Sequence, residues 1–176
     1  MRGLLRNAFR RAPSNGANGR LIHDYFRHKA QSQGYTLSHS QQRVIDCMAQ
    51  QASLLFGASA QTPASLYLHG AVGRGKSWLL DGFFQALPTA QKQRVHFHAF
   101  FARLHQGMFE HREQDDALDV TLDELLHDCR VLCFDEFHVH DIGDAARDAR
   151  VHLALARLGL GVGQGVGPVI GVKRRI

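Results

Sequence analysis

Eight consecutive residues have the composition of a loop that binds nucleotide phosphates, namely Gly70-Ala71-Val72-Gly73-Arg74-Gly75-Lys76-Ser77. They fit the pattern G-x-x-x-x-G-K-[S/T]. Backbone N–H groups can converge on a phosphate only where no Cβ blocks the approach, which explains the glycines. Lys76 would place a positive charge near the β- and γ-phosphates, and the Ser77 hydroxyl would complete a Mg²⁺ shell. The loop therefore predicts a nucleoside triphosphate site.

Two carboxylates, Asp135 and Glu136, end the stretch 130–136, in which residues 131–134 are all apolar. Such a run is typical of a central parallel strand that is covered on both faces. In P-loop enzymes the first carboxylate holds Mg²⁺ through its water shell, and the second can polarise the attacking water as a general base. In isolation the pair could be an acidic end of a strand. With the loop upstream, it favours a nucleotide hydrolase in which Lys76 and Glu136 are the catalytic candidates.

The elements that would position these residues form an α/β pattern. A strand at 66–69 leads into the loop, and a helix at 76–87 follows it and stops before Pro88. The order of elements predicts a parallel sheet wound with helices. Before the loop we expect a linker at 12–19, a short helix from Leu21, and a helix from the capping box at Ser38 to about Leu55. After it we expect a strand at 94–100, a helix at 101–112, a short helix capped at Thr121, and a strand at 130–135. Leu104, His105 and Met108 should point inward from the helix at 101–112.

Length, charge and cysteine content limit the class of protein. A chain of 176 residues suits one α/β domain. No apolar run has the length of a membrane span, which argues against an integral membrane protein. Three cysteines without framework spacing suit a reducing compartment. The first twenty residues are rich in arginine and lack acids, so they resemble either a transit peptide or a flexible basic arm. We expect a cytoplasmic protein, with the mitochondrial matrix as the alternative.

The net charge of +5 belongs to the two ends of the chain. Residues 1–23 and residues 145–176 each carry +5, so the interval 24–144 carries −5. The segment with the recognisable chemistry is therefore acidic, and nucleic-acid binding has little support.

Two rival functions depend on other residues. The pairs His96 and His98, and His138 and His140, would share strand faces near Cys133, which could suit Zn²⁺. His-x-His on a strand more often packs or hydrogen-bonds, so we do not expect a metal site of this kind. Residues 135–138 also match the D-E-x-H box of helicases. The downstream helicase motifs are missing, and the acidic interval argues against a nucleic-acid-stimulated motor.

Four stretches of the chain resemble the ZapE-type cell-division ATPases, which are AAA+ proteins related to a mitochondrial Afg-type group. The resemblance covers roughly residues 21–145. The matching stretches are Gly34-Tyr35-Thr36-Leu37 with Gln41-Gln42, residues 66–77, residues 94–100, and residues 132–145.

The resemblance implies a three-layer AAA+ P-loop fold with a parallel sheet. It further implies that the chain uses ATP and Mg²⁺, with Asp135 and Ser77 at the metal, Gly70 to Ser77 at the nucleotide and Glu136 as the base. ATP hydrolysis would be coupled to remodelling of a protein partner, a tubulin-like division GTPase, and the chain could form a homo-oligomer.

The resemblance stops at about Ala145, although the family is about twice as long as this chain. We expect a basic arm at 1–20, the ATPase part at 21–145, and an atypical glycine-rich tail at 146–176. The family's sensor strand, which lies between the P-loop strand and the Asp135 strand, cannot be located, nor can its arginine finger. Residues 166–172 are a candidate for this strand, but Pro168 cannot donate a hydrogen bond in a central strand. These features suggest a truncated or frameshifted reading frame, an incomplete sheet and slow hydrolysis. The alternative is a catalytically dead nucleotide-binding or interaction module.

Overall fold

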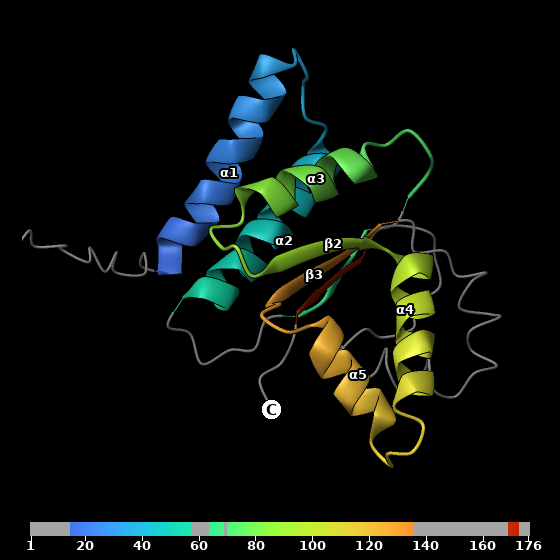
Figure 1. Ribbon diagram of the computed structural model, residues 1–176. Coiled ribbons are helices and arrows are strands. Elements are labelled where there is room, and N and C mark those ends of the chain that lie inside the picture. Colours follow the sequence, from blue (N-terminus) through green and yellow to red (C-terminus); the bar gives the residue numbers. More distant parts are fainter. Residues whose placement is uncertain (1–14, 58–63, 69, 136–168, 173–176) are drawn as a thin grey trace, which may run out of the picture.

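The computed structural model describes residues 15–57, 64–68, 70–135 and 169–172 (Figure 1). None of the helices in these ranges is long and apolar enough to cross a membrane. The helices are α1 (Asn15–Ser32), α2 (His39–Phe56), α3 (Lys76–Ala86), α4 (Phe97–Glu110) and α5 (Ala117–Leu125). The strands are β1 (Leu66–Tyr67), β2 (Lys92–His96), β3 (Val131–Asp135) and β4 (Val169–Val172).

The four strands form one mixed sheet in the order β1-β4-β3-β2. β2 and β3 are parallel, with His96 opposite Asp135. β4 is antiparallel to both β1 and β3, so β1 and β3 run in the same direction. The prediction of a parallel sheet holds for β1, β2 and β3 and is wrong for β4.

The centre of the sheet is closed, against the expectation that it would be open. β4 lies between β1 and β3, where the missing strand was expected. Pro168 does not prevent this because the strand begins at the next residue, Val169. Val169 and Ile170 are β-branched and suit a strand, and the antiparallel direction lets the segment enter without a parallel crossover.

Helices cover both faces of the sheet, with α1, α2 and α3 on one face and α4 and α5 on the other (Figure 1). The side chains of β3 alternate between the two cores. Val131 and Cys133 pack with the first group of helices, and Leu132 and Phe134 pack with the second. All four are buried, as the predicted central strand requires.

Local sequence signals located α2 and α3 well. Ser38 and Gln41 form the expected capping box, with the Ser38 hydroxyl accepting from the backbone N–H of Gln41 and the Gln41 side chain accepting from the backbone N–H of Ser38. α3 begins at Lys76 and ends before Pro88, as predicted. Leu79, Leu80 and Phe83 are its buried apolar face.

The start of α1 corrects the predicted linker at 12–19, because the helix already includes residues 15–19. Gly19 lies in the contact between α1 and α2. A Cβ at this position would stand 3.3 Å from the carbonyl oxygen of Ala49 and 2.8 Å from Oγ of Ser53. Glycine therefore serves close helix packing here rather than flexibility. Residues 15–20 of the arm expected at 1–20 are therefore helical, and residues 1–14 lie outside the described residues.

The boundary between β2 and α4 differs from the predicted strand at 94–100. The strand ends at His96, and Phe97 already belongs to α4. Phe97, Phe100, Phe101 and Leu104 are buried with the spacing of one helix face, and this pattern prevails over the short alternation before it.

Two smaller expectations on this side of the sheet were also wrong. His105 is exposed rather than inward, whereas Leu104 is buried and Met108 is partly buried. Thr121 does not cap a helix. It lies inside α5, and its hydroxyl donates to the carbonyl oxygen of Ala117 at 2.7 Å.

Candidate active site

The glycine-rich loop connects β1 to the start of α3 in a conformation that requires its glycines. Gly70, Gly73 and Gly75 have φ angles of 145°, 79° and 79°. L-residues with a side chain rarely adopt such angles, so glycine is needed at these positions. Gly75 is the N-cap of α3 and has left-handed backbone angles. The first N–H groups of a helix have no partner within the helix, so the loop ends on donors suited to an anion.

The side chain of Lys76 folds over its own loop. Its Nζ donates to the carbonyl oxygens of Gly70 and Ala71 at 2.8 and 3.0 Å. Ser77 is exposed on the first turn of α3, and Val72 is 97% exposed at the loop tip. The loop therefore presents an ammonium group, a hydroxyl and helix N–H groups along one short segment.

Gln41 ties the loop to α2. Its Nε2 donates to the carbonyl oxygen of Arg74 at 3.3 Å, while its Oε1 accepts from the backbone N–H of Ser38 at 2.9 Å. Sequence analysis indicated Gln41 as a capping residue and as part of the family resemblance, but not as a contact of the loop. Its second contact depends on how α2 packs beside the loop, which no local pattern reveals.

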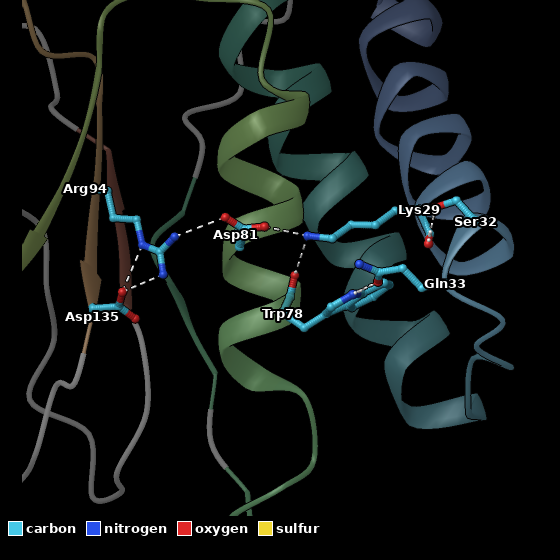
Figure 2. Close-up of polar contacts among 7 residues, drawn as sticks. All are labelled: Lys29, Ser32, Gln33, Trp78, Asp81, Arg94 and Asp135. Carbon is cyan, nitrogen blue, oxygen red and sulfur yellow. Dashed lines mark hydrogen bonds and ion pairs between the residues drawn. The ribbon is translucent and has the colours of Figure 1, made fainter.

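Asp135 lies at the C-terminal end of β3. Because β1 and β3 run in the same direction, Asp135 and the loop that follows β1 lie at the same edge of the sheet. The Asp135 side chain is 16% exposed. It accepts two hydrogen bonds from Arg94 of β2 at the same oxygen, Oδ2: from Nε at 2.9 Å and from Nη2 at 2.6 Å (Figure 2).

Two more charged side chains, Asp81 and Lys29, connect Arg94 to α1 (Figure 2). Nη1 of Arg94 donates to Oδ1 of Asp81 on α3 at 3.2 Å. Oδ2 of Asp81 accepts from Nζ of Lys29 on α1 at 2.5 Å. The Lys29 side chain is only 13% exposed, and its Nζ also lies over the ring of Trp78. Sequence analysis singled out none of Arg94, Asp81 and Lys29 for the site.

The residues of the loop and Asp135 fit a nucleotide with Mg²⁺. Positive φ angles and missing Cβ atoms leave the loop backbone open to phosphates. A hydroxyl and a carboxylate are oxygen donors of the kind that Mg²⁺ prefers. Oδ1 of Asp135 receives no hydrogen bond from the described residues. Glu136 lies outside the described residues, so its role as a base remains a prediction.

The histidine arrangement considered for Zn²⁺ does not form on the described part of the chain. His96 ends β2, whereas His98 belongs to α4, so the two do not share a strand face. His138 and His140 lie outside the described residues. Within those residues no group of three or more histidines, cysteines and acids could hold a metal ion. Burial raises the pKa of the Cys133 thiol to about 12, so this side chain is a neutral core residue at pH 7.

The family model of the AFG1-like ATPases matches residues 16–162. The chain belongs to this family. The match extends beyond both ends of the expected ATPase part at 21–145, so sequence like that of the family continues into the segment from 146 that was expected to lack it. An ATPase family with a P-loop accounts for the observed combination of helices and strands.

Individual relatives match shorter stretches. The cell division protein ZapE of Escherichia coli (strain K12) is 50% identical over 80 residues, which is 46% of this chain and 21% of ZapE. An uncharacterised protein of Schizosaccharomyces pombe is 38% identical over 106 residues, covering 56% of this chain and 23% of that protein. The lactation elevated protein 1 homolog B of Danio rerio is 32% identical over 95 residues, which is 47% of this chain and 19% of that protein. The matches span less than a quarter of each relative's length. No solved structure matches the chain.

Proposed function

We propose that this chain binds ATP with Mg²⁺ at the loop of residues 70–77 and hydrolyses it. The observation that carries the proposal is the loop itself, with three glycines at positive φ between β1 and α3 and with Asp135 at the same sheet edge. Membership of an ATPase family supports it. We also place the fold in the AAA+ type, as the resemblance implies.

Each residue of the site has a separate role in this proposal. The N–H groups of residues 70–77 bind the phosphates, and Lys76 leaves the carbonyl oxygens of Gly70 and Ala71 to reach them. The Ser77 hydroxyl and Asp135 hold Mg²⁺, which neutralises charge on the phosphates. Glu136 orients the attacking water and takes its proton.

The biological setting is a proposal taken from the relatives. The E. coli relative is named a cell division protein. We propose that ATP hydrolysis here remodels a protein partner in cell division, by resemblance a tubulin-like GTPase, in the cytoplasm. The mitochondrial matrix is the alternative. The resemblance also implies that the chain could act as a homo-oligomer.

Glu136→Gln is the variant that tests hydrolysis. It keeps the shape of the side chain and removes the base, so ATP binding should persist while steady-state turnover falls by about 10²–10⁴-fold. Equal turnover in the wild type and in Glu136→Gln would contradict the assigned role. ATP binding without turnover in the wild type would instead favour the catalytically dead module. Strong stimulation by nucleic acid would favour the helicase-like alternative.

A further inference from the structure

We infer that Arg94 is a positioning residue for the Mg²⁺ site and that Asp81 balances its charge. The inference rests on the proposed function, because it requires Asp135 to act at the metal. Arg94 touches no reacting group. It acts through the carboxylate of Asp135, and its own position depends on α3 and, through Asp81, on α1.

The first step is the hold on Asp135. Two N–H groups of one guanidinium, Nε–H and Nη2–H, converge on Oδ2 at 2.9 and 2.6 Å. Two charge-assisted hydrogen bonds from one planar group to the same oxygen fix the position of Oδ2. Arg94 is opposite Cys133 in the parallel ladder, two residues before Asp135, so the fork reaches along the same face of the sheet. The hold thus leaves Oδ1 as the oxygen that can face the metal's water shell.

The second step is the balance of charge. A guanidinium beside a metal ligand fixes the carboxylate but also repels Mg²⁺. Asp81 offsets this repulsion because its Oδ1 accepts from Nη1 of Arg94 at 3.2 Å. Lys29 in turn pairs with Oδ2 of Asp81. Lys29, Asp81, Arg94 and Asp135 alternate in sign along this row and sum to zero (Figure 2).

The third step is that these four charged residues connect different elements of the fold. Arg94 and Asp135 lie on neighbouring strands, Asp81 lies on the helix that begins at the P-loop, and Lys29 lies on α1. Lys29 also donates to the carbonyl oxygen of Trp78, two residues after Lys76. The side chains of Lys29, Arg94 and Asp135 are 13%, 30% and 16% exposed, and that of Asp81 is 39% exposed. Bulk water therefore screens the two contacts of Asp81 more than it screens the contact of Arg94 with Asp135. A shift in the position of α1 should therefore be passed on through Asp81 and Arg94 to the carboxylate of Asp135.

The test measures how much Mg²⁺ is needed for a fluorescent ATP analogue to bind tightly. Arg94→Lys keeps the charge but loses the fork, and Asp81→Asn leaves the charge of Arg94 unbalanced. Both changes should raise the Mg²⁺ concentration at half-saturation, by about threefold to tenfold for Arg94→Lys. Binding of the analogue in EDTA should stay near the wild-type value in both, because the P-loop is untouched.

Lys92→Arg is the matched control. Lys92 lies two residues before Arg94 on β2, and its Nζ donates to the carbonyl oxygens of Phe84 and Leu87 at the end of α3, not to Asp135. The Mg²⁺ concentration at half-saturation should be the same for Lys92→Arg as for the wild type. If Arg94→Lys folds, binds the analogue in EDTA and needs no more Mg²⁺ than the wild type, the inference is wrong. If Arg94→Lys does not fold, the same criterion applies to Asp81→Asn. The inference is then wrong if Asp81→Asn binds the analogue in EDTA and needs no more Mg²⁺ than the wild type.

Asp135→Asn separates this inference from the proposed function. If Asp135→Asn raises the Mg²⁺ requirement and Arg94→Lys does not, only the role of Arg94 fails. If Asp135→Asn leaves the requirement unchanged, the metal role of Asp135 fails and the inference fails with it. In the double variant Arg94→Lys/Asp135→Asn, we expect no further increase over Asp135→Asn, since Arg94 acts through that carboxylate.

Discussion

Gln41 of α2 donates a hydrogen bond from Nε2 to the carbonyl oxygen of Arg74 at 3.3 Å, in the glycine-rich loop. The same side chain closes the capping box with Ser38, so the N-terminus of α2 and the loop share one amide group. The space beside this amide is small. A Cβ on Gly75 would stand 3.1 Å from Nε2 of Gln41. The loop conformation is thus fixed both by its own glycines and by a neighbouring helix.

Gly75→Ala should lower folding stability moderately and should remove most of the stabilisation that nucleotide gives to the protein. Its φ of 79° disfavours any side chain, and the added methyl group would press on Gln41. We expect a loss of about 1–3 kcal/mol of folding stability and a loss of most nucleotide-induced stabilisation. Gly34→Ala is the matched control, because Gly34 also has a positive φ, of 66°, but lies outside the loop. Equal nucleotide-induced shifts in melting temperature for the two variants would contradict this account.

Gly107 and Thr121 form a tight contact between α4 and α5. A Cβ on Gly107 would lie 2.5 Å from Cγ2 of Thr121. Gly107→Ala should therefore lower the free energy of unfolding by about 1–3 kcal/mol through overpacking. Thr121→Ser removes the clashing methyl group and keeps the hydroxyl that donates to Ala117. Denaturant titration of both single variants and the double variant should show recovery in the double, whereas purely additive losses would refute the contact.

Cys133 should make the fold less stable at high pH. Burial raises the pKa of its thiol to about 12, above the ordinary value of 9.0, so the folded state holds this proton more tightly than the unfolded state. The contribution is complete below about pH 9 and is lost as the pH rises towards 12, at up to about 1.4 kcal/mol per pH unit.

The measurement for Cys133 compares the unfolding free energy of the wild type and Cys133→Ala between pH 8 and pH 11. The comparison is needed because desolvation lowers the pKa of Lys92, and that group has the opposite effect on stability as the pH rises. Cys133→Ala should be less stable at pH 8 but should lose less stability on going to pH 11. Parallel pH profiles would show that the thiol does not titrate in this way.

The residues with strong local constraints were predictable from the sequence, and those placed by distant partners were not. The loop 70–77, the start of α3 and the buried strand before Asp135 follow from glycine geometry, Pro88 and a continuous apolar run. The contacts of Arg94 with Asp135 and Asp81 join residues 41 and 13 positions apart in sequence, and no local pattern records them.

The errors have the same physical origin. β4 pairs with strands more than thirty residues away, and its place depends on an open position between β1 and β3 that only the assembled sheet provides. The glycine at position 19 suggested a loop, yet it serves the contact of α1 with α2. At residues 97–101 the helical spacing of the buried Phe97, Phe100 and Phe101 outweighed a short alternating pattern. In each case tertiary packing decided between two local possibilities.

Nucleotide-induced stabilisation of the wild type and of Lys76→Ala is the measurement that tests the central claim most directly. The change removes the ammonium group that lies over the loop and leaves the glycine conformation intact. Arg103→Ala, which removes one exposed positive charge from α4 on the other face of the sheet, is the control. ATP with Mg²⁺ at about 100 times its Kd should stabilise the wild type and the control by about 2.7 kcal/mol. Lys76→Ala should gain little at the same concentration. An undiminished gain in Lys76→Ala would show that this loop is not the nucleotide site.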